Sequence, residues 1–162
     1  MRDTCWTAGL ILSLVTLVCA GRTATAGPSA AAPGAPAQAP KELTEQDYAG
    51  LMKKVGPTYQ ALRKKLESGA TADAAKDAQH LAEFFGQVER FWAQHKKADA
   101  VKWAQQARTS ASDAAGAATT GNTDKAQAAA GSMAGMCKQC HSTYREGDAS
   151  TGFRIKPAAL KH

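Results

Sequence analysis

Two cysteines three residues apart, followed at once by a histidine, are the residues of this chain best suited to do chemistry. They are Cys137, Cys140 and His141. A Cys-x-x-Cys-His sequence is typical of covalent haem attachment, in which two thiols add to the vinyl groups of one haem. The histidine reaches the iron from the proximal side. Because cysteines three apart on a helix face the same way, the spacing predicts one covalently bound haem c.

Three other interpretations of these residues are weighed against haem. A thioredoxin-like redox pair lies at the start of a helix in an α/β fold, whereas this pair lies near the end of an expected helix. A zinc site needs two further soft ligands, but the other two cysteines, Cys5 and Cys19, fall in an expected signal peptide. A plain disulfide beside a solvent-facing histidine is the third. The motif, the expected export and the cysteine count together favour haem.

The sequence does not decide whether Met52, His95 or no residue of the protein binds the opposite side of the iron. Met52 lies on the inward stripe of the first expected helix, near the end of the bundle that holds His141. A methionine thioether is a suitable axial ligand and tends to raise the haem potential, but most methionines on such stripes only fill the core. His95 continues the apolar stripe of the second expected helix and is the rival.

The elements that position these residues are expected to be helices. Of the 162 residues 44% are hydrophobic but only 6% aromatic, and alanine, a strong helix former and a weak strand former, makes up most of the difference. Apolar residues at steps of three and four predict four helices, over 44–68, 71–97, 99–118 and 123–147. Long helices with short links predict an all-α, antiparallel up-down-up-down four-helix bundle, with Phe84 and Trp103 in the core around the haem.

The segments outside the bundle have their own signals. Residues 1–26 are expected to be a secretory signal peptide, because the apolar run over 10–18 is too short to span a bilayer and Ala24-Thr25-Ala26 fits a cleavage site. Cleavage after Ala20 is the alternative. Residues 27–40, rich in proline and alanine, are expected to be a disordered linker, followed by the bundle domain over 41–147 and a tail over 148–162. A soluble periplasmic protein without a stable membrane anchor is expected.

Two motifs resemble the class II c-type cytochromes, the family of cytochrome c prime and its low-spin, methionine-ligated relatives. Cys137-Lys-Gln-Cys-His-Ser-Thr-Tyr-Arg145 is similar to that family's Cys-x-x-Cys-His-x-x-Tyr-Arg segment, and its position late in the chain is discriminating. Residues 51–56, Leu-Met-Lys-Lys-Val-Gly, resemble the family's Leu-Met-Lys-x-x-Gly stretch. The resemblance covers residues 43–147, with strong motifs only at the two ends, and Tyr48 stands where the family commonly has an arginine.

The resemblance implies a monohaem cytochrome that transfers electrons through Fe(II)/Fe(III) cycling. The alternative is five-coordinate iron that binds nitric oxide or carbon monoxide, as in cytochrome c prime. Tyr144 and Arg145 are implied to face the haem, Arg145 through a propionate or over the proximal imidazole. No acid–base pair or nucleophile is visible beside the haem motif, so an enzyme is not expected.

Charge indicates the kind of partner. The formal net charge is +6, and no basic run with interleaved aromatic residues is present, so nucleic acid is not an expected partner. The lysines on the first expected helix, Lys53 and Lys54 among them, are expected to form a solvated face. The functional alternative is that they dock an acidic periplasmic redox protein. Homodimer formation is left open.

Overall fold

The computed structural model describes residues 41–161. Residues 1–40 and His162 lie outside that range, and with them the signal peptide expected over 1–26 and the linker expected over 27–40. The described residues belong to one compact unit.

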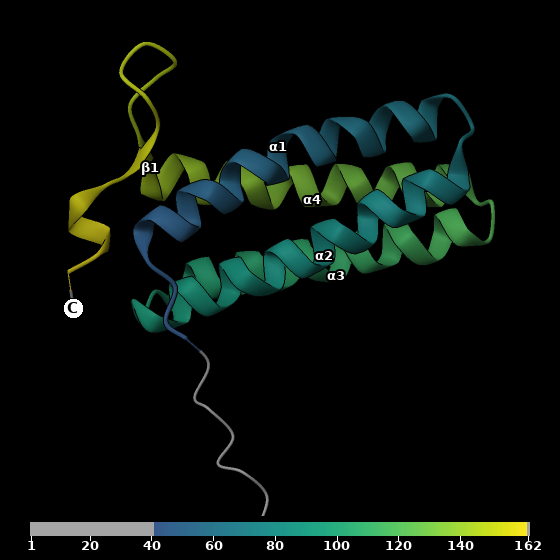
Figure 1. The fold of residues 1–162 in the computed structure, drawn as a ribbon. Helices are drawn as coiled ribbons and strands as arrows, with labels where there is room; N and C mark the ends of the chain where they lie inside the picture. The colour runs from purple at the N-terminus through teal and green to yellow at the C-terminus, as the bar shows by residue number, and fades with distance from the viewer. Residues whose placement is uncertain (1–40, 162) are drawn as a thin grey trace, which may run out of the picture. The chain divides into compact units, whose positions relative to one another are not determined.

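Four long helices make up most of this unit, and the expectation of an all-helical fold is confirmed. They are α1 (Glu45–Glu67), α2 (Thr71–Gln94), α3 (Ala98–Thr119) and α4 (Thr123–Tyr144). The four helices pack together, and three-residue links over 68–70, 95–97 and 120–122 join them (Figure 1). Within the set, α1 packs chiefly on α2, and α4 packs chiefly on α3.

Local signals in the sequence determine where the helices begin and end. Thr44 caps α1 in a capping box, since its Oγ1 accepts from the Asp47 N–H at 3.1 Å while an Asp47 oxygen accepts from the Thr44 N–H at 3.0 Å. The link after α1 turns at Gly69, and the link after α3 turns at Gly121, each with a positive φ that glycine adopts without strain. Asn122 then caps α4 through the Lys125 N–H. These boundaries were predicted.

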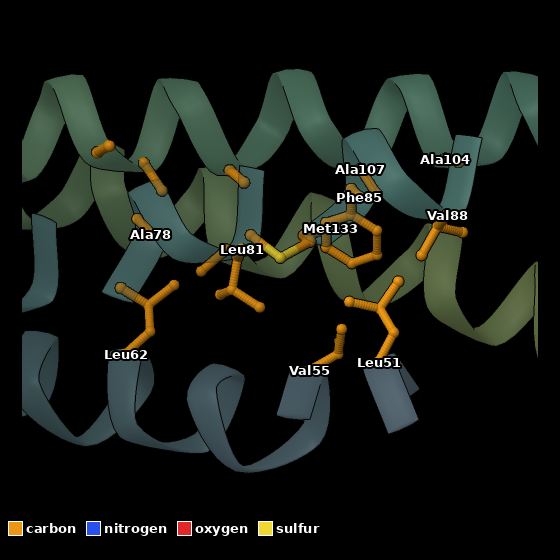
Figure 2. Packing of buried hydrophobic residues seen from close by; sticks show 14 of the residues in the cluster. Leu51, Val55, Leu62, Ala78, Leu81, Phe85, Val88, Ala104, Ala107 and Met133 are labelled. Atoms are coloured by element: carbon orange, nitrogen blue, oxygen red, sulfur yellow. The ribbon is translucent and has the colours of Figure 1, made fainter. Parts of the chain in front are cut away.

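The core lies along the axis between the helices. Leucine and valine side chains of α1 meet Leu81 and Phe85 of α2, and Met133 of α4 belongs to the same cluster (Figure 2). The α3 side of this core consists of alanines, which allow a close approach of the neighbouring backbone. One prediction for α2 was wrong in detail, because Phe85 is buried and Phe84 is half-buried against the edge of the core.

A short hairpin follows α4, where the sequence indicated only a tail. The fourth helix was expected to end at Gly147, but it ends at Tyr144 because the next two residues enter a strand. Strand β1 (Arg145–Glu146) pairs antiparallel with β2 (Arg154–Ile155), and a 3-10 helix η1 (Pro157–Ala159) follows. The Lys156 ammonium donates to the last carbonyls of α4, 2.7 Å from that of Thr143, and Ala159 is buried. The hairpin is therefore anchored to the bundle end.

The turn of this hairpin depends on its glycines and on one aspartate. Asp148 accepts hydrogen bonds from the backbone of Ser150 and Thr151, at 2.8 and 2.9 Å. Gly147 has a φ of 83°, and a Cβ at this position would collide with the carbonyl oxygen of Gly152. Glycine at position 147 is thus required for the two strands to close.

Candidate functional site

An aromatic cluster at one end of the helices surrounds the motif. The Tyr48 ring, at the start of α1, stacks on Phe91 with centroids 4.4 Å apart, and the Trp92 indole N–H donates to the Tyr48 hydroxyl at 3.3 Å. Trp92 also lies 4.6 Å from the ring of Tyr144 at the end of α4. Three helices therefore contribute to one cluster, in which Tyr48 lies close to Cys140.

The two thiols of the motif lie on the same side of α4 and are half-buried. Burial raises the pKa of Cys137, and it raises the pKa of Cys140 to about 12, with the Cys137 and Asp99 charges adding to the shift. Both thiols are therefore protonated near neutral pH. A dithiol that attacks disulfides needs the opposite, a pKa lowered toward neutrality at a helix N-terminus.

The surroundings of the His141 imidazole favour its neutral form. The ring is half-buried on the last turn of α4, and burial, followed by the charge of Arg145, lowers its pKa. A lowered pKa favours the neutral ring, which is the form that binds a metal ion. Two protonated, half-buried thiols and one neutral imidazole thus fit the donor set that a covalent haem requires.

Met52 lies on α1 between two contacts with α4. Near the start of α1, Tyr48 reaches Cys140, and further along Tyr59 donates to the Ala130 carbonyl at 3.2 Å. Met52 falls between these points, half-buried against the core. The stretch of α4 that these contacts bracket contains Cys137. The thioether is therefore in the neighbourhood of the motif, and its role as a ligand stays a prediction.

The surface between α1 and α4 contains a groove, and this boundary between the two helices is called the seam below. A groove of about 340 Å³ separates the two helices farther from the motif. Its lining residues are Tyr59, Arg63, Leu66, Glu67, Gln127, Ala130 and Gly131. Both helices pack mainly on their other neighbours, so the contact between α1 and α4 is the smallest among the adjacent helices of the described residues.

His95 belongs to the same aromatic cluster. It is the residue directly after α2, half-buried, and its ring lies 4.6 Å from that of Phe91 and 6.5 Å from that of Trp92. The rival ligand is thus at the motif's end of the bundle, whereas His80 lies early in the same helix, beside Phe84.

Arg145 and Tyr144 occupy different surroundings. The Arg145 guanidinium is exposed and lies 4.4 Å from the ring centroid of Phe153. Tyr144 is half-buried against Trp92 and donates to the Asp99 carboxylate at 2.6 Å. Trp103 is half-buried near Tyr144, with ring centroids 6.2 Å apart. Phe84, expected beside the haem with Trp103, lies farther back along α2.

Sequence reasoning did not assign Asp99 or Trp92 to the site. Asp99 was expected as the first residue of a helix, and α3 does begin beside it, at Ala98. Its second role, as acceptor for Tyr144, joins residues 45 apart in the chain and has no local signal. Tyr48 was named as a departure from a family pattern, although it provides the contact with Cys140.

The bond between Tyr144 and Asp99 predicts a pH effect. Burial and the Asp99 carboxylate raise the pKa of Tyr144 to about 12, above the value of 10 expected in the unfolded chain. The neutral phenol therefore stabilises the fold fully below pH 10, and this contribution is lost as the pH rises to about 12. We expect Asp99→Asn to lower the Tyr144 pKa, because the amide carries no charge.

Alkaline titration of isotope-labelled tyrosine, followed by nuclear magnetic resonance, measures this pKa. Tyr144→Phe assigns the resonance, and Tyr59 serves as an internal control because it has no contact with Asp99 in the structure. A Tyr144 resonance that titrates unchanged in Asp99→Asn would contradict the assignment.

No family model matches the chain, and neither the curated proteins nor the solved structures that were compared contain a match. Among the helices of residues 41–161, none has the length and apolar character needed to cross a membrane.

Proposed function

We propose that this chain is a monohaem c-type cytochrome that carries electrons and turns over no substrate. When bound, haem supplies an iron centre that gains and loses one electron. Cys137 and Cys140 would hold it by thioether bonds, and His141 would be the proximal ligand. The observation that carries the proposal is the position of two half-buried thiols and one half-buried imidazole together near the end of α4, where burial favours protonated thiols and a neutral imidazole.

The chemistry of the thiols favours haem over a dithiol redox role. Thiols with raised pKa values are poor nucleophiles toward disulfides in the absence of an activating group. Haem attachment instead needs two reduced thiols at one spacing, both close to the bundle interior. The half-burial of Cys137 and Cys140 beside Tyr48 meets that requirement.

An up-down-up-down order of the helices is part of the proposal. Its support is the pair of contacts between α1 and α4: moving forward from Tyr48 to Tyr59 on α1 corresponds to moving back from Cys140 to Ala130 on α4. Antiparallel neighbours have this register. In that arrangement the seam between α1 and α4 is where haem would enter.

The second candidate is binding of nitric oxide or carbon monoxide at five-coordinate iron. The apolar rings of Phe91 and Trp92 favour it, since a closed aromatic surface holds few groups able to ligate iron. Met52 and His95, both in the same neighbourhood, favour six-coordinate iron and electron transfer. The visible absorption spectrum of the purified protein, oxidised and reduced, distinguishes high-spin iron open to gases from low-spin iron.

Export to the periplasm belongs to the same proposal, because haem c is attached outside the cytoplasm. We expect the mature chain to begin at Gly27, or at Gly21 if cleavage follows Ala20. The mass of the intact purified protein and the sequence of its N-terminal peptide measure this. A chain recovered in the membrane fraction with Met1 in place would contradict it.

A further inference from the structure

We propose that the hairpin after α4 is the docking surface for an acidic electron-transfer protein. The surface, called the hairpin surface below, consists of Arg145, Phe153 and Arg154. The inference rests on the proposed function, because it names the partner of the haem-bearing end of the bundle.

The first observation is the exposure of Phe153. Among the described residues it is the one large apolar side chain that is exposed, with 56% of its surface accessible, although other apolar residues of the same segment, Ile155 and Leu160, pack against the bundle. A hairpin that served only to cap α4 would gain nothing from an exposed ring. Aromatic side chains and arginines are the residues most often found at the centres of protein interfaces.

The second observation is the charge around that ring. The guanidinium of Arg145 lies over Phe153, and within residues 41–161 no ion pair involves Arg145. Glu146 is paired with Arg154 at 2.7 Å, and Asp148 is occupied by the turn. The positive charge of Arg145 is thus left for an incoming carboxylate. Because the Phe153 ring already holds the plane of the Arg145 guanidinium, the arginine loses little conformational freedom when a partner binds.

The third observation is the place of the hairpin surface. Arg145 follows the last residue of α4 directly and lies four residues after His141 in the chain. The hairpin, of which β1 is the first strand, projects from this end of the bundle (Figure 1). A partner bound to it would lie next to the motif, and electron transfer requires this closeness. Lys64 and Lys65, in contrast, lie in the last turn of α1, at the opposite end of that helix from Tyr48.

Charge and the size of the apolar contact also favour an acidic protein over two other partners, a second copy of the chain and a membrane surface. A second copy of the chain would bring a like-charged hairpin to the same surface, and like charges oppose such contacts. A membrane surface would need more than one inserted ring and a larger basic cluster for stable attachment. An acidic protein surface needs only complementary charge and a small apolar contact, typical of transient redox complexes.

Binding of the haem-loaded protein to a plant-type [2Fe–2S] ferredoxin, used as an acidic redox probe, tests the proposal by titration calorimetry. We expect binding at low ionic strength that weakens with added salt. Phe153→Ala should weaken it about tenfold, and Phe153→Tyr, which keeps the ring, should change it less than about twofold. Arg145→Glu should weaken it further, because it reverses the positive charge that is left for the partner's carboxylate. The matched control is Lys53→Ala with Lys54→Ala, which should change it less than about twofold.

Several results would overturn the proposal. They are an absence of binding at low salt, equal affinity of Phe153→Ala and the parent, or loss of affinity only in the Lys53 and Lys54 variant. Phe153-dependent binding to phosphatidylserine vesicles without binding to the probe would assign the surface to a membrane. A dimer in sedimentation that Phe153→Ala dissolves would assign it to a second copy. Calorimetry does not depend on the haem spectrum, so a protein without haem c refutes the proposed function separately.

Discussion

Haem should stay attached to this chain through denaturing electrophoresis. In protein produced with a haem attachment system, the band at the size of the mature chain should stain for haem, and its mass should exceed that of the polypeptide by one haem. Cys137→Ser or Cys140→Ser should weaken the attachment, because one thioether bond remains, and the double variant should abolish it. The expected loss is close to complete, which makes this the most direct test of the proposed function.

The matched control for this test lies between the two cysteines. Lys138 and Gln139 are exposed, so Lys138→Ala with Gln139→Ala changes the motif without touching its donors and should retain full haem. Protein that emerges without haem, and with stoichiometric zinc or with a disulfide between the two cysteines, would refute the proposal.

Replacement of Met52 by alanine should convert low-spin iron to high-spin iron. If the thioether is the sixth ligand, the oxidised parent protein shows the weak far-red charge-transfer band of methionine-ligated haem, and Met52→Ala removes it. The iron then becomes open to carbon monoxide. The potential should fall by about tenths of a volt, since axial ligands set haem potentials over about 0.8 V.

Two variants serve as controls for the Met52 test. Met136→Ala removes another half-buried methionine, on α4, and His95→Ala removes the rival ligand; both should leave the band intact. A parent protein that is already high-spin and binds carbon monoxide would show that Met52 only packs, in favour of the gas-binding candidate. Conversion to high-spin iron by His95→Ala alone would identify a second histidine as the ligand.

The helices could be predicted because their signals are local. The capping box at Thr44, the glycines at 69 and 121, and the cap at Asn122 each act within a few residues of the boundary that they determine. The burial of Phe85 rather than Phe84 could not be predicted in this way. Both follow Leu81 at helical spacing, and the neighbouring helices decide which ring enters the core.

The site was predicted less completely than the fold. Cys137, Cys140 and His141 carry their chemistry in their spacing, so the sequence alone was enough to name them as candidates. The cluster that surrounds them joins Tyr48, Trp92 and Tyr144 from three helices, and such contacts have no signature in a single chain. The hairpin was missed because two-residue strands show no periodicity, although the aspartate and the two glycines of its turn were a readable signal.

Gly147 has a consequence for how relatives of this chain would be recognised. Alanines and leucines of a bundle core can be exchanged in compensating sets, so the four helices would drift in composition over evolutionary time. Position 147 has no such freedom, because a Cβ would strike the Gly152 carbonyl and separate the strands. Among homologues that keep the hairpin, glycine at this position should therefore persist after the similarity of the helices has faded. Inheritance of the hairpin could then be traced from one residue just beyond the Cys-x-x-Cys-His motif.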